Sequence, residues 1–286
     1  MRLVYVGTSA FALEVLLASG LEPALVVTRP PAPRGRGRRL AATPVADGAR
    51  GRGLEVLEPQ RLEDAAGRID AVEPDLVILC AYGALVREPL LSSHEILNVH
   101  PSLLPRWRGA APIERAIMAG DARSGVSLMR LVAELDAGPV CASAATAIAP
   151  DDDYGTLAAR LAALAGALLA DAVERPRRYV DQPDEGITYA EKIGPADREL
   201  DPGRPAAVLE RAVRALHPHI GCHLPGGLGV LKARLVDGPA LDAGELAGED
   251  GRIFFGASPG TLELLVVRPA GARAMEAAAY LRGHGV

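Results

Sequence analysis

Short runs of aliphatic and β-branched residues alternate with helix-like stretches through about the first 150 residues, and this alternation constrains the fold more than any other feature. The apolar runs are 3–7, 24–28, 54–58, 76–82, 95–100 and 127–132, and the helix-like stretches are 10–19, 43–53, 61–72 and 112–119. Strands separated by helices pair in parallel, with helices on both faces of the sheet. The sequence therefore predicts an α/β fold with a Rossmann-like parallel sheet.

The rest of the chain changes in style. An alanine- and leucine-rich helix is expected over 153–175, opened by three consecutive aspartates. Proline, glycine and charged residues then predict a linker over 181–203, which separates a first domain (1–180) from a second (204–286). The second domain combines one helix near 205–216 with short strands separated by glycines. We expect a small β-barrel of the OB type there.

Several classes of protein are disfavoured. Gly7 is the only glycine in the first strand-to-helix turn, so a nicotinamide cofactor is not expected. The three cysteines are far apart, and we predict no disulfide framework and no metal. We find neither a signal peptide nor an apolar run of the roughly 18 residues that span a membrane. We therefore expect a cytoplasmic monomer with no membrane partner.

The stretch NVHPSLLPRWRGAAPIERA, residues 98–116, follows the apolar run at 95–100. In an extended segment Asn98 and His100 project to the same face, near the carboxyl end of the strand, where open α/β sheets bind ligands. Pro101 and Pro105 stiffen the segment that follows, so that 102–105 becomes an irregular apolar wall. Together these features favour a binding or catalytic site.

An amide beside an imidazole is suited to acyl transfer to an amine. Asn98 and a protonated His100 could donate hydrogen bonds to the oxygen that becomes negative during attack. The incoming amine also loses a proton, which requires a nearby carboxylate. Asp136 is the candidate, because its Leu-Asp-Ala-Gly-Pro context predicts a loop at the same sheet edge.

A basic segment suggests an anionic partner, although the chain as a whole carries a formal charge of −5. Between residues 29 and 53 there are seven arginines and one acid, Asp47. The glycines in this segment suggest a mobile loop, either solvated or facing an anion.

At these residues the chain resembles the folate-dependent formyltransferases. The resemblance rests on Asn98-x-His100, on 102–105, on RWRGAAPI at 106–113, and on 125–140 with Asp136, all in the family's order and spacing. Further segments resemble the branch of the family that acts on methionyl-tRNA: 35–45, 81–83, 188–193 and 266–275. Pro101 stands where we associate glycine with that branch.

The resemblance implies transfer of a formyl group from 10-formyltetrahydrofolate to the α-amine of methionyl-initiator tRNA, without a metal. It assigns catalysis to Asn98, His100 and Asp136. Folate binding falls to Ser102, Leu103, Leu104, Pro105, Tyr82 and Gly83. Contacts with the tRNA acceptor end fall to Arg34, Arg36, Gly37, Arg38 and Arg39, with further backbone contacts from the second domain.

Three alternatives share part of this pattern. A formyltransferase acting on an amino sugar nucleotide or on glycinamide ribonucleotide would share the Asn-His-Asp set but would not need the arginine segment, the 188–193 motif or the second domain. A hydrolase that releases formate from the same folate would use water as its nucleophile. A non-catalytic tRNA-binding protein would need the arginines without the catalytic set.

One further cluster is ambiguous. HPHIGCH at 217–223 brings His217, His219, Cys222 and His223 close together in sequence, but the spacing matches no standard zinc pattern. We expect these to be surface residues of the second domain's first strand.

Overall fold

The computed structural model of the protein describes residues 1–34 and 38–284. Its contacts divide the chain into two compact units, the first made of 1–110, 124–146 and 158–190, and the second of 111–123, 147–157 and 191–286. Of the predicted linker, 181–190 therefore packs with the first unit and 191–203 with the second. The predicted domain boundaries at 180 and 203 stay a prediction.

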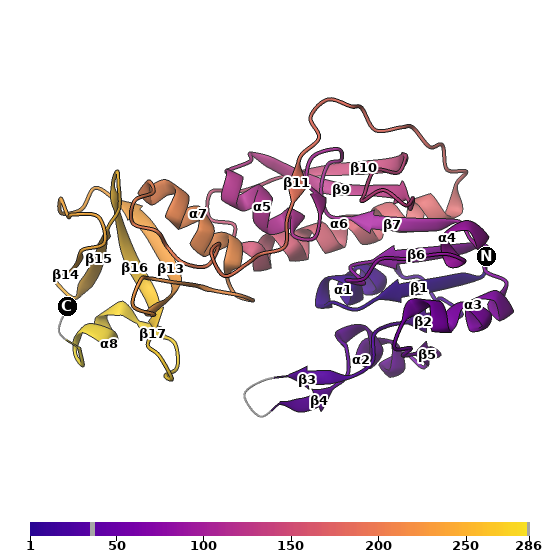
Figure 1. The fold of residues 1–286 in the computed structure, drawn as a ribbon, viewed down its shortest axis with the longest axis horizontal. Helices are drawn as coiled ribbons and strands as arrows, with labels where there is room; N and C mark the ends of the chain where they lie inside the picture. The colour runs from indigo at the N-terminus through magenta and orange to yellow at the C-terminus, as the bar shows by residue number, and fades with distance from the viewer. Residues whose placement is uncertain (35–37, 285–286) are drawn as a thin grey trace. The chain divides into compact units, whose positions relative to one another are not determined.

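A seven-stranded sheet forms the centre of the first unit, in the order β10-β9-β7-β6-β1-β2-β5 (Figure 1). Its strands are β1 (Leu3–Gly7), β2 (Leu25–Val27), β5 (Val56–Leu57), β6 (Leu76–Cys80), β7 (Ile96–His100), β9 (Arg123–Arg130) and β10 (Val140–Ala147). β5, β2, β1, β6 and β7 run parallel to one another, which confirms the predicted α/β class. β9 is antiparallel to β7, so the sheet is mostly but not wholly parallel.

The helices of this part of the chain begin and end at residues that the sequence marks. They are α1 (Ala10–Ser19), α2 (Pro44–Gly51), the 3-10 turn η1 (Leu62–Ala65), α3 (Ala66–Val72), α4 (Leu90–Ser93) and α6 (Tyr154–Glu174). Ser9 caps α1 by accepting a hydrogen bond from the Ala12 amide, and Gly20 ends it in the left-handed conformation. At α6, the Asp153 carboxylate accepts the Thr156 amide, as the aspartate run predicts.

Side chains on the strands alternate between the two faces of the sheet. Val4, Val6 and Ile96 belong to one core cluster with η1, α3 and α4, whereas Leu97 and Val99 point to the opposite face. Asn98 and His100 share the face of Ile96 but lie toward the carboxyl end of β7. The parallel topology therefore brings them to the edge where such sheets bind ligands.

Part of the arginine segment forms two short strands. β3 (Ala32–Arg34) and β4 (Arg39–Ala41) pair as an antiparallel hairpin, with Pro33 opposite Leu40. The expectation of a loop is therefore wrong for 32–34 and 39–41. The mobile loop expected at Gly35 and Gly37 lies outside the described residues and stays a prediction.

Helix α6 corrects the expectation that the chain has no apolar stretch long enough to span a membrane. By length and composition alone it is apolar enough to cross a membrane, with a mean hydropathy of 1.6 over 18 residues. Half of that window is buried within the protein, including Leu161 and Leu169, and Gly166 lies against Ala18 of α1. The core helix of a soluble protein has the same character, so the feature is weak support for a membrane span.

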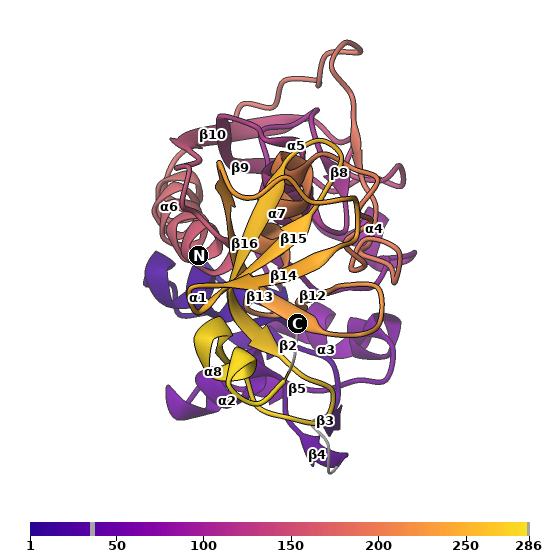
Figure 2. The ribbon, with the colours of Figure 1, turned by 90° about the vertical axis from the view of Figure 1, so that its left-hand side faces the viewer.

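The second unit contains an antiparallel sheet in the order β12-β13-β16-β15-β14, with β17 paired to β16 (Figure 2). Its elements are α5 (Pro112–Ala119), α7 (Ala206–Leu216), β12 (Cys222–His223), β13 (Gly229–Val236), β14 (Leu246–Glu249), β15 (Arg252–Gly256), β16 (Thr261–Arg268), β17 (Met275–Glu276) and α8 (Ala277–Leu281). Leu209, Val213 and Leu216 of α7 share a core with Phe255 and Leu264. Closure of this sheet into an OB-type barrel stays a prediction.

The sequence suggested that the whole HPHIGCH tract lies at the surface, but part of it is buried. Cys222 is buried, and burial raises the pKa of its thiol to about 12, so it is not the thiolate that binds metals. His219 stacks on Tyr154 and lies 2.9 Å from Glu114 Oε1, and His217 lies 3.8 Å from Asp153 Oδ2. These side chains serve the packing of the second unit.

Candidate active site

The structure brings Asn98, His100 and Asp136 together at the carboxyl end of β7; we call these three residues the trio. Asn98 Nδ2 lies 3.4 Å from Asp136 Oδ1, and His100 Nδ1 lies 3.6 Å from Asp136 Oδ2. The His100 and Asp136 side chains are only 5% and 12% exposed. Because these side chains are largely shielded from water, charge interactions among them are stronger than at the surface.

Both ring nitrogens of His100 have defined neighbours. Nε2 lies 2.8 Å from the backbone carbonyl oxygen of Trp107, and because a carbonyl only accepts, this nitrogen carries a hydrogen. The other nitrogen, Nδ1, faces the Asp136 carboxylate. Protonation of the ring therefore adds a hydrogen on the side of Asp136 and produces an ion pair within the site.

Asp136 is held in an uncommon backbone conformation, with φ of 45°. Aspartate tolerates the left-handed region better than most residues, which explains why an aspartate can occupy this turn. Its Oδ2 accepts a hydrogen bond of 2.8 Å from the Gly109 amide, while Oδ1 faces Asn98. The carboxylate is thus oriented from two sides.

The segment that supplies the Trp107 carbonyl and the Gly109 amide is held by a short parallel strand pair. β8 (Arg108–Gly109) pairs with β11 (Tyr189–Ala190), and the Thr188 hydroxyl accepts a hydrogen bond from the Trp107 amide. Gly109 has φ of 120°, and a Cβ there would lie 2.7 Å from the Ala190 carbonyl oxygen. Only glycine fits this position.

This pairing changes the interpretation of the TYAEKI motif. The sequence suggested that 188–193 favours a tRNA acceptor, but residues 188–190 form part of the wall of the site itself. They would serve any acceptor that uses the trio. The motif therefore supports the presence of the site more than it supports a tRNA acceptor.

The predicted folate wall follows β7 directly. Ser102 is buried, and its hydroxyl donates to the Arg106 carbonyl oxygen at 2.6 Å. Leu103, Leu104 and Pro105 are half-buried, so their apolar side chains keep exposed surface that a flat ring could cover. The Leu104 amide donates to Ser127 Oγ, which itself donates to the Ser102 carbonyl oxygen. The wall is therefore apolar and rigid, as a folate site requires.

Tyr82 and Gly83 differ from each other. Tyr82 is buried among the apolar residues of the sheet face, where burial raises the pKa of its hydroxyl, and its carbonyl oxygen accepts from Thr8 Oγ1 at 3.1 Å. Gly83 is exposed, with φ of 78°. A ligand would therefore meet the backbone here rather than the Tyr82 ring.

The arginines assigned to tRNA lie on or beside the β3–β4 hairpin. Arg38 and Arg39 are exposed, Arg38 has φ of 46°, and Arg34 contributes its backbone to β3. Arg36 and Gly37 lie outside the described residues.

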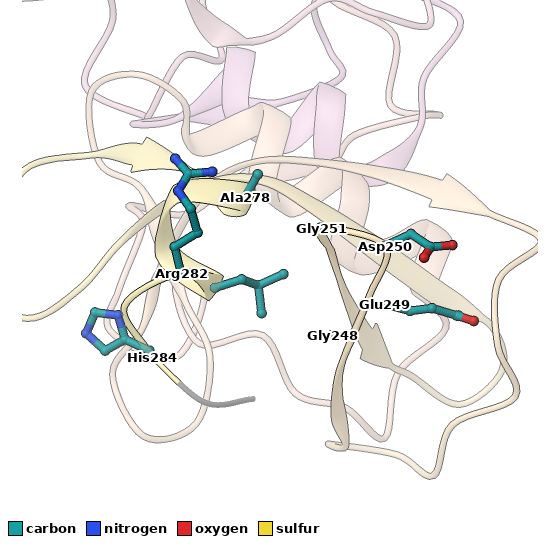
Figure 3. Close-up of a pocket in the computed structure, with 8 residues that line it drawn as sticks. Gly248, Glu249, Asp250, Gly251, Ala278, Arg282 and His284 are labelled. Carbon is teal, nitrogen blue, oxygen red and sulfur yellow. The ribbon is translucent and has the colours of Figure 1, made fainter.

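Figure 3 shows a hollow of about 420 Å³ in the second unit. Glu249 ends β14 and Asp250 lies in the turn that follows it, while Arg282 and His284 come from the residues after α8. Exposed side chains line most of this hollow, and it contains none of the trio. Within 1–34 and 38–284, no group of three His, Cys, Asp or Glu side chains is arranged to hold a metal.

Comparison with known proteins shows the family to which the chain belongs. The family model "Formyl transferase" matches residues 9–173, and the model "Formyl transferase, C-terminal domain" matches 192–285. The chain belongs to the formyl transferase family. It is 43% identical to the methionyl-tRNA formyltransferase of Halorhodospira halophila, over 99% of this chain and 96% of that protein.

Two solved structures share the fold at low identity. An N-formyltransferase from Helicobacter canadensis, in complex with folinic acid and dTDP-3-aminofucose, is 14% identical with a TM-score of 0.69, covering 96% of this chain and 100% of that one. HypX from Aquifex aeolicus in complex with tetrahydrofolic acid is 16% identical with a TM-score of 0.66, covering 98% of this chain and 47% of that one. The fold is therefore shared with proteins that have different names.

Sequence reasoning missed several residues that build the site. Trp107 and Gly109 lie within the 106–113 run that carries the resemblance, but their contribution is a carbonyl and an amide, which no side-chain pattern reveals. The only signal in the sequence is the glycine itself, which suggests a backbone with positive φ, and Gly109 has this conformation. Thr188 was noted only as part of the 188–193 motif, and its contact with Trp107 was missed because the two residues are 81 positions apart.

Proposed function

We propose that the chain transfers the formyl group of 10-formyltetrahydrofolate to the α-amino group of methionyl-initiator tRNA, for the initiation of bacterial-type translation. The observation that carries this proposal is the 43% identity to a methionyl-tRNA formyltransferase over nearly the full length of both proteins. The assembled trio supports it, because its three groups match the needs of acyl transfer to an amine.

Asn98 and His100 are assigned to the formyl oxygen. The Asn98 amide carries two hydrogens, and one of them lies toward Asp136. The other is the donor that we assign to the oxygen as negative charge develops on it. When its ring is protonated, His100 adds positive charge beside the same oxygen.

Asp136 is assigned to the proton of the amine. The attacking nitrogen must lose a proton as the C–N bond forms, and a carboxylate held at fixed orientation accepts it directly or through water. The Gly109 amide stabilises Oδ2, so Oδ1 is the oxygen that we assign to the substrate. Fixing the carboxylate in advance lowers the entropic cost of reaching the transition state.

The folate co-substrate supplies the formyl group and is assigned to Ser102, Leu103, Leu104, Pro105, Tyr82 and Gly83. The half-buried apolar wall at 103–105 fits a flat heteroaromatic ring, and the backbone around Gly83 adds exposed peptide groups. Holding this wall against β9 through Ser127 keeps the donor's carbonyl carbon in a constant position relative to the trio.

The tRNA is assigned to the β3–β4 hairpin. Arg34, Arg36, Gly37, Arg38 and Arg39 would contact its acceptor end, and the exposure of Arg38 and Arg39 supports this for the described part. We further propose that the protein acts as a cytoplasmic monomer without metal or membrane partner. The packing of α6 against α1 supports the last point.

An acceptor panel tests the proposal. The purified protein and 10-formyltetrahydrofolate are incubated with methionyl-initiator tRNA, methionyl-elongator tRNA, free methionine, glycinamide ribonucleotide and a dTDP-amino sugar. We expect formylation of the initiator tRNA, weaker formylation of the elongator tRNA, and none of the small amines. Formylation of a small amine with the charged tRNA unmodified would overturn the assignment, and release of formate without acceptor would identify a hydrolase.

A further inference from the structure

Gln182 occupies a special place beside the trio, in the segment predicted to be a linker. Two residues before it, Val180 pairs with Val140 through two backbone hydrogen bonds of 2.8 and 2.9 Å. That pairing places Gln182 beside the loop that joins β9 to β10, which contains Asp136. Gln182 itself is half-buried.

Every hydrogen-bonding position of the Gln182 amide is used. Its Nε2 donates to the carbonyl oxygens of Asp136 and Gly138, both at 2.8 Å. Its Oε1 accepts from Arg108 Nε at 3.1 Å and Nη2 at 2.9 Å. The amide can face only one way, because a flip would set oxygen against two carbonyls and hydrogens against the guanidinium.

These four hydrogen bonds join the two segments that build the site. On one side they hold the backbone of Asp136, which has φ of 45°, and of Gly138, where a Cβ would overlap the Arg130 carbonyl oxygen. On the other side they hold Arg108, which is 5% exposed and precedes the Gly109 amide that binds the Asp136 carboxylate. Gln182 therefore holds the backbone of Asp136 directly. It also holds Arg108, which precedes the Gly109 amide that binds the Asp136 carboxylate.

We infer that Gln182 is a positioning residue for formyl transfer, which holds the Asp136 carboxylate at its working distance from His100 and Asn98. The inference rests on the proposed function for the reaction that it affects, but the contacts belong to the protein alone. Without the Gln182 amide, the carbonyl oxygens of Asp136 and Gly138 lose the donor that holds them. Arg108 loses a neutral partner that fixes its orientation. The carboxylate then samples positions from which it accepts the amine's proton less often.

The test compares Gln182→Ala and Gln182→Glu with Gln60→Ala, which changes the other glutamine of the chain, an exposed one. We expect Gln182→Ala to lower kcat for methionyl-initiator tRNA by roughly 10- to 100-fold, with the KM for 10-formyltetrahydrofolate changed less than about threefold. Gln182→Glu keeps an acceptor for Arg108 but sets a carboxylate against two carbonyl oxygens, so its kcat should fall similarly. Gln60→Ala should match the unsubstituted protein.

A double-variant cycle separates positioning from a general structural effect. In an Asp136→Ala background, single-turnover rates should fall less than about threefold on adding Gln182→Ala, because the residue acts through the missing carboxylate. An equal fold-loss in both backgrounds would overturn the inference, as would a folded Gln182→Ala variant with kcat within about twofold. If Gln182→Ala does not fold, Gln182→Glu is judged by the same criteria.

The single tryptophan provides a readout that needs no acceptor. Trp107 adjoins Arg108, so release of Arg108 should increase acrylamide quenching of its fluorescence in Gln182→Ala. Neither Gln182→Glu, which keeps an acceptor for Arg108, nor Gln60→Ala should show this increase. If the unsubstituted protein formylates no charged tRNA, the proposed function fails, and the quenching result alone judges Gln182. Unaltered quenching in a folded Gln182→Ala variant would then overturn the bracing role.

Discussion

The trio and the β3–β4 hairpin are both functional candidates of the first unit, yet their polar side chains are held in opposite ways. Asn98, His100 and Asp136 are buried or nearly so and contact one another or a fixed backbone group. Arg38 and Arg39 are exposed on a two-stranded hairpin. Only the trio is pre-organised.

The difference follows from what each region has to do. Stabilising charge in a transition state requires donors and bases at fixed positions, and a displacement of 1 Å removes much of the benefit. Attracting a polyanion requires only positive charge near phosphates, which long and mobile side chains supply. Chemistry therefore accounts for the dense contacts around Asp136, and tRNA binding would not need them at the hairpin.

Removing a member of the trio should produce the largest effect. Asn98→Ala, His100→Ala and Asp136→Ala should each lower turnover by roughly a hundredfold or more, the scale of losing an oxyanion donor or a general base. The measurement is single-turnover formylation, with circular dichroism as the check on folding. The double variant His100→Ala with Asp136→Ala should lose less than the product of the single losses, since the two side chains act as one unit. Near-normal turnover in any folded variant would remove that residue from the mechanism.

Crowding the wall of the site should have the next largest effect. Gly109→Ala places a Cβ 2.7 Å from the Ala190 carbonyl oxygen at φ of 120°, which displaces the amide that binds Asp136. We expect a loss of roughly tenfold or more in kcat, with about 1–3 kcal/mol less stability in urea unfolding.

Gly53→Ala is the matched control, because Gly53 also has a positive φ, of 73°, but has open space around it. It should lose stability without losing kcat. Equal kcat in the two variants would mean that the Gly109 amide does not position Asp136.

Changing the hairpin should have a smaller and different effect. Arg38→Ala or Arg39→Ala should raise the KM for methionyl-initiator tRNA a few-fold and remove roughly one unit from the slope of log affinity against log salt, with kcat and the KM for folate unchanged. Arg36→Ala should matter most, because the resemblance assigns that position to the acceptor end. It should also reduce discrimination against elongator tRNA.

Arg61→Ala is the control for the hairpin, since its side chain is 67% exposed but belongs to a different segment. A hairpin variant that behaves like this control across a salt series would exclude the hairpin from tRNA binding. A fall in kcat instead would mean that the hairpin and the trio are not separate in function.

The smallest effect concerns a polar group that is held firmly but lies outside the site. The Arg177 guanidinium, and then the Tyr179 hydroxyl, hold the pKa of Glu95 below its usual value by hydrogen bonding to the carboxylate that precedes β7. A lowered pKa contributes stability above the unfolded-state value of about 4.3, and this stability is lost as pH falls through the folded-state value.

Glu95→Gln should therefore lower the melting temperature by no more than roughly 2–4 °C at pH 7 and flatten the fall in stability toward acid pH. Thermal unfolding between pH 7 and pH 3 measures both. Turnover should stay close to normal at pH 7. A large loss of turnover would show that contacts around β7 and the trio are coupled.

Much of the fold could be predicted because it depends on local patterns. The apolar runs at β1, β6 and β7 and the caps of α1 and α6 lie where sequence signals place them. β10 was missed, since its alanine-rich sequence has weak strand propensity and it lies at the sheet edge. The antiparallel direction of β9 was also missed, because direction depends on how the chain returns to the sheet.

The sequence by itself determined which chemical groups are available, that Asn98 and His100 lie at the end of a strand, and that Asp136 follows another strand. Tertiary structure alone decided how they are aimed. The Trp107 carbonyl, the Gly109 amide and the Gln182 amide reach the trio through pairings between segments 27 to 81 residues apart or through backbone groups that every residue possesses. Backbone groups carry no residue-specific signal, and contacts between distant segments exist only once the sheet has set both ends in place.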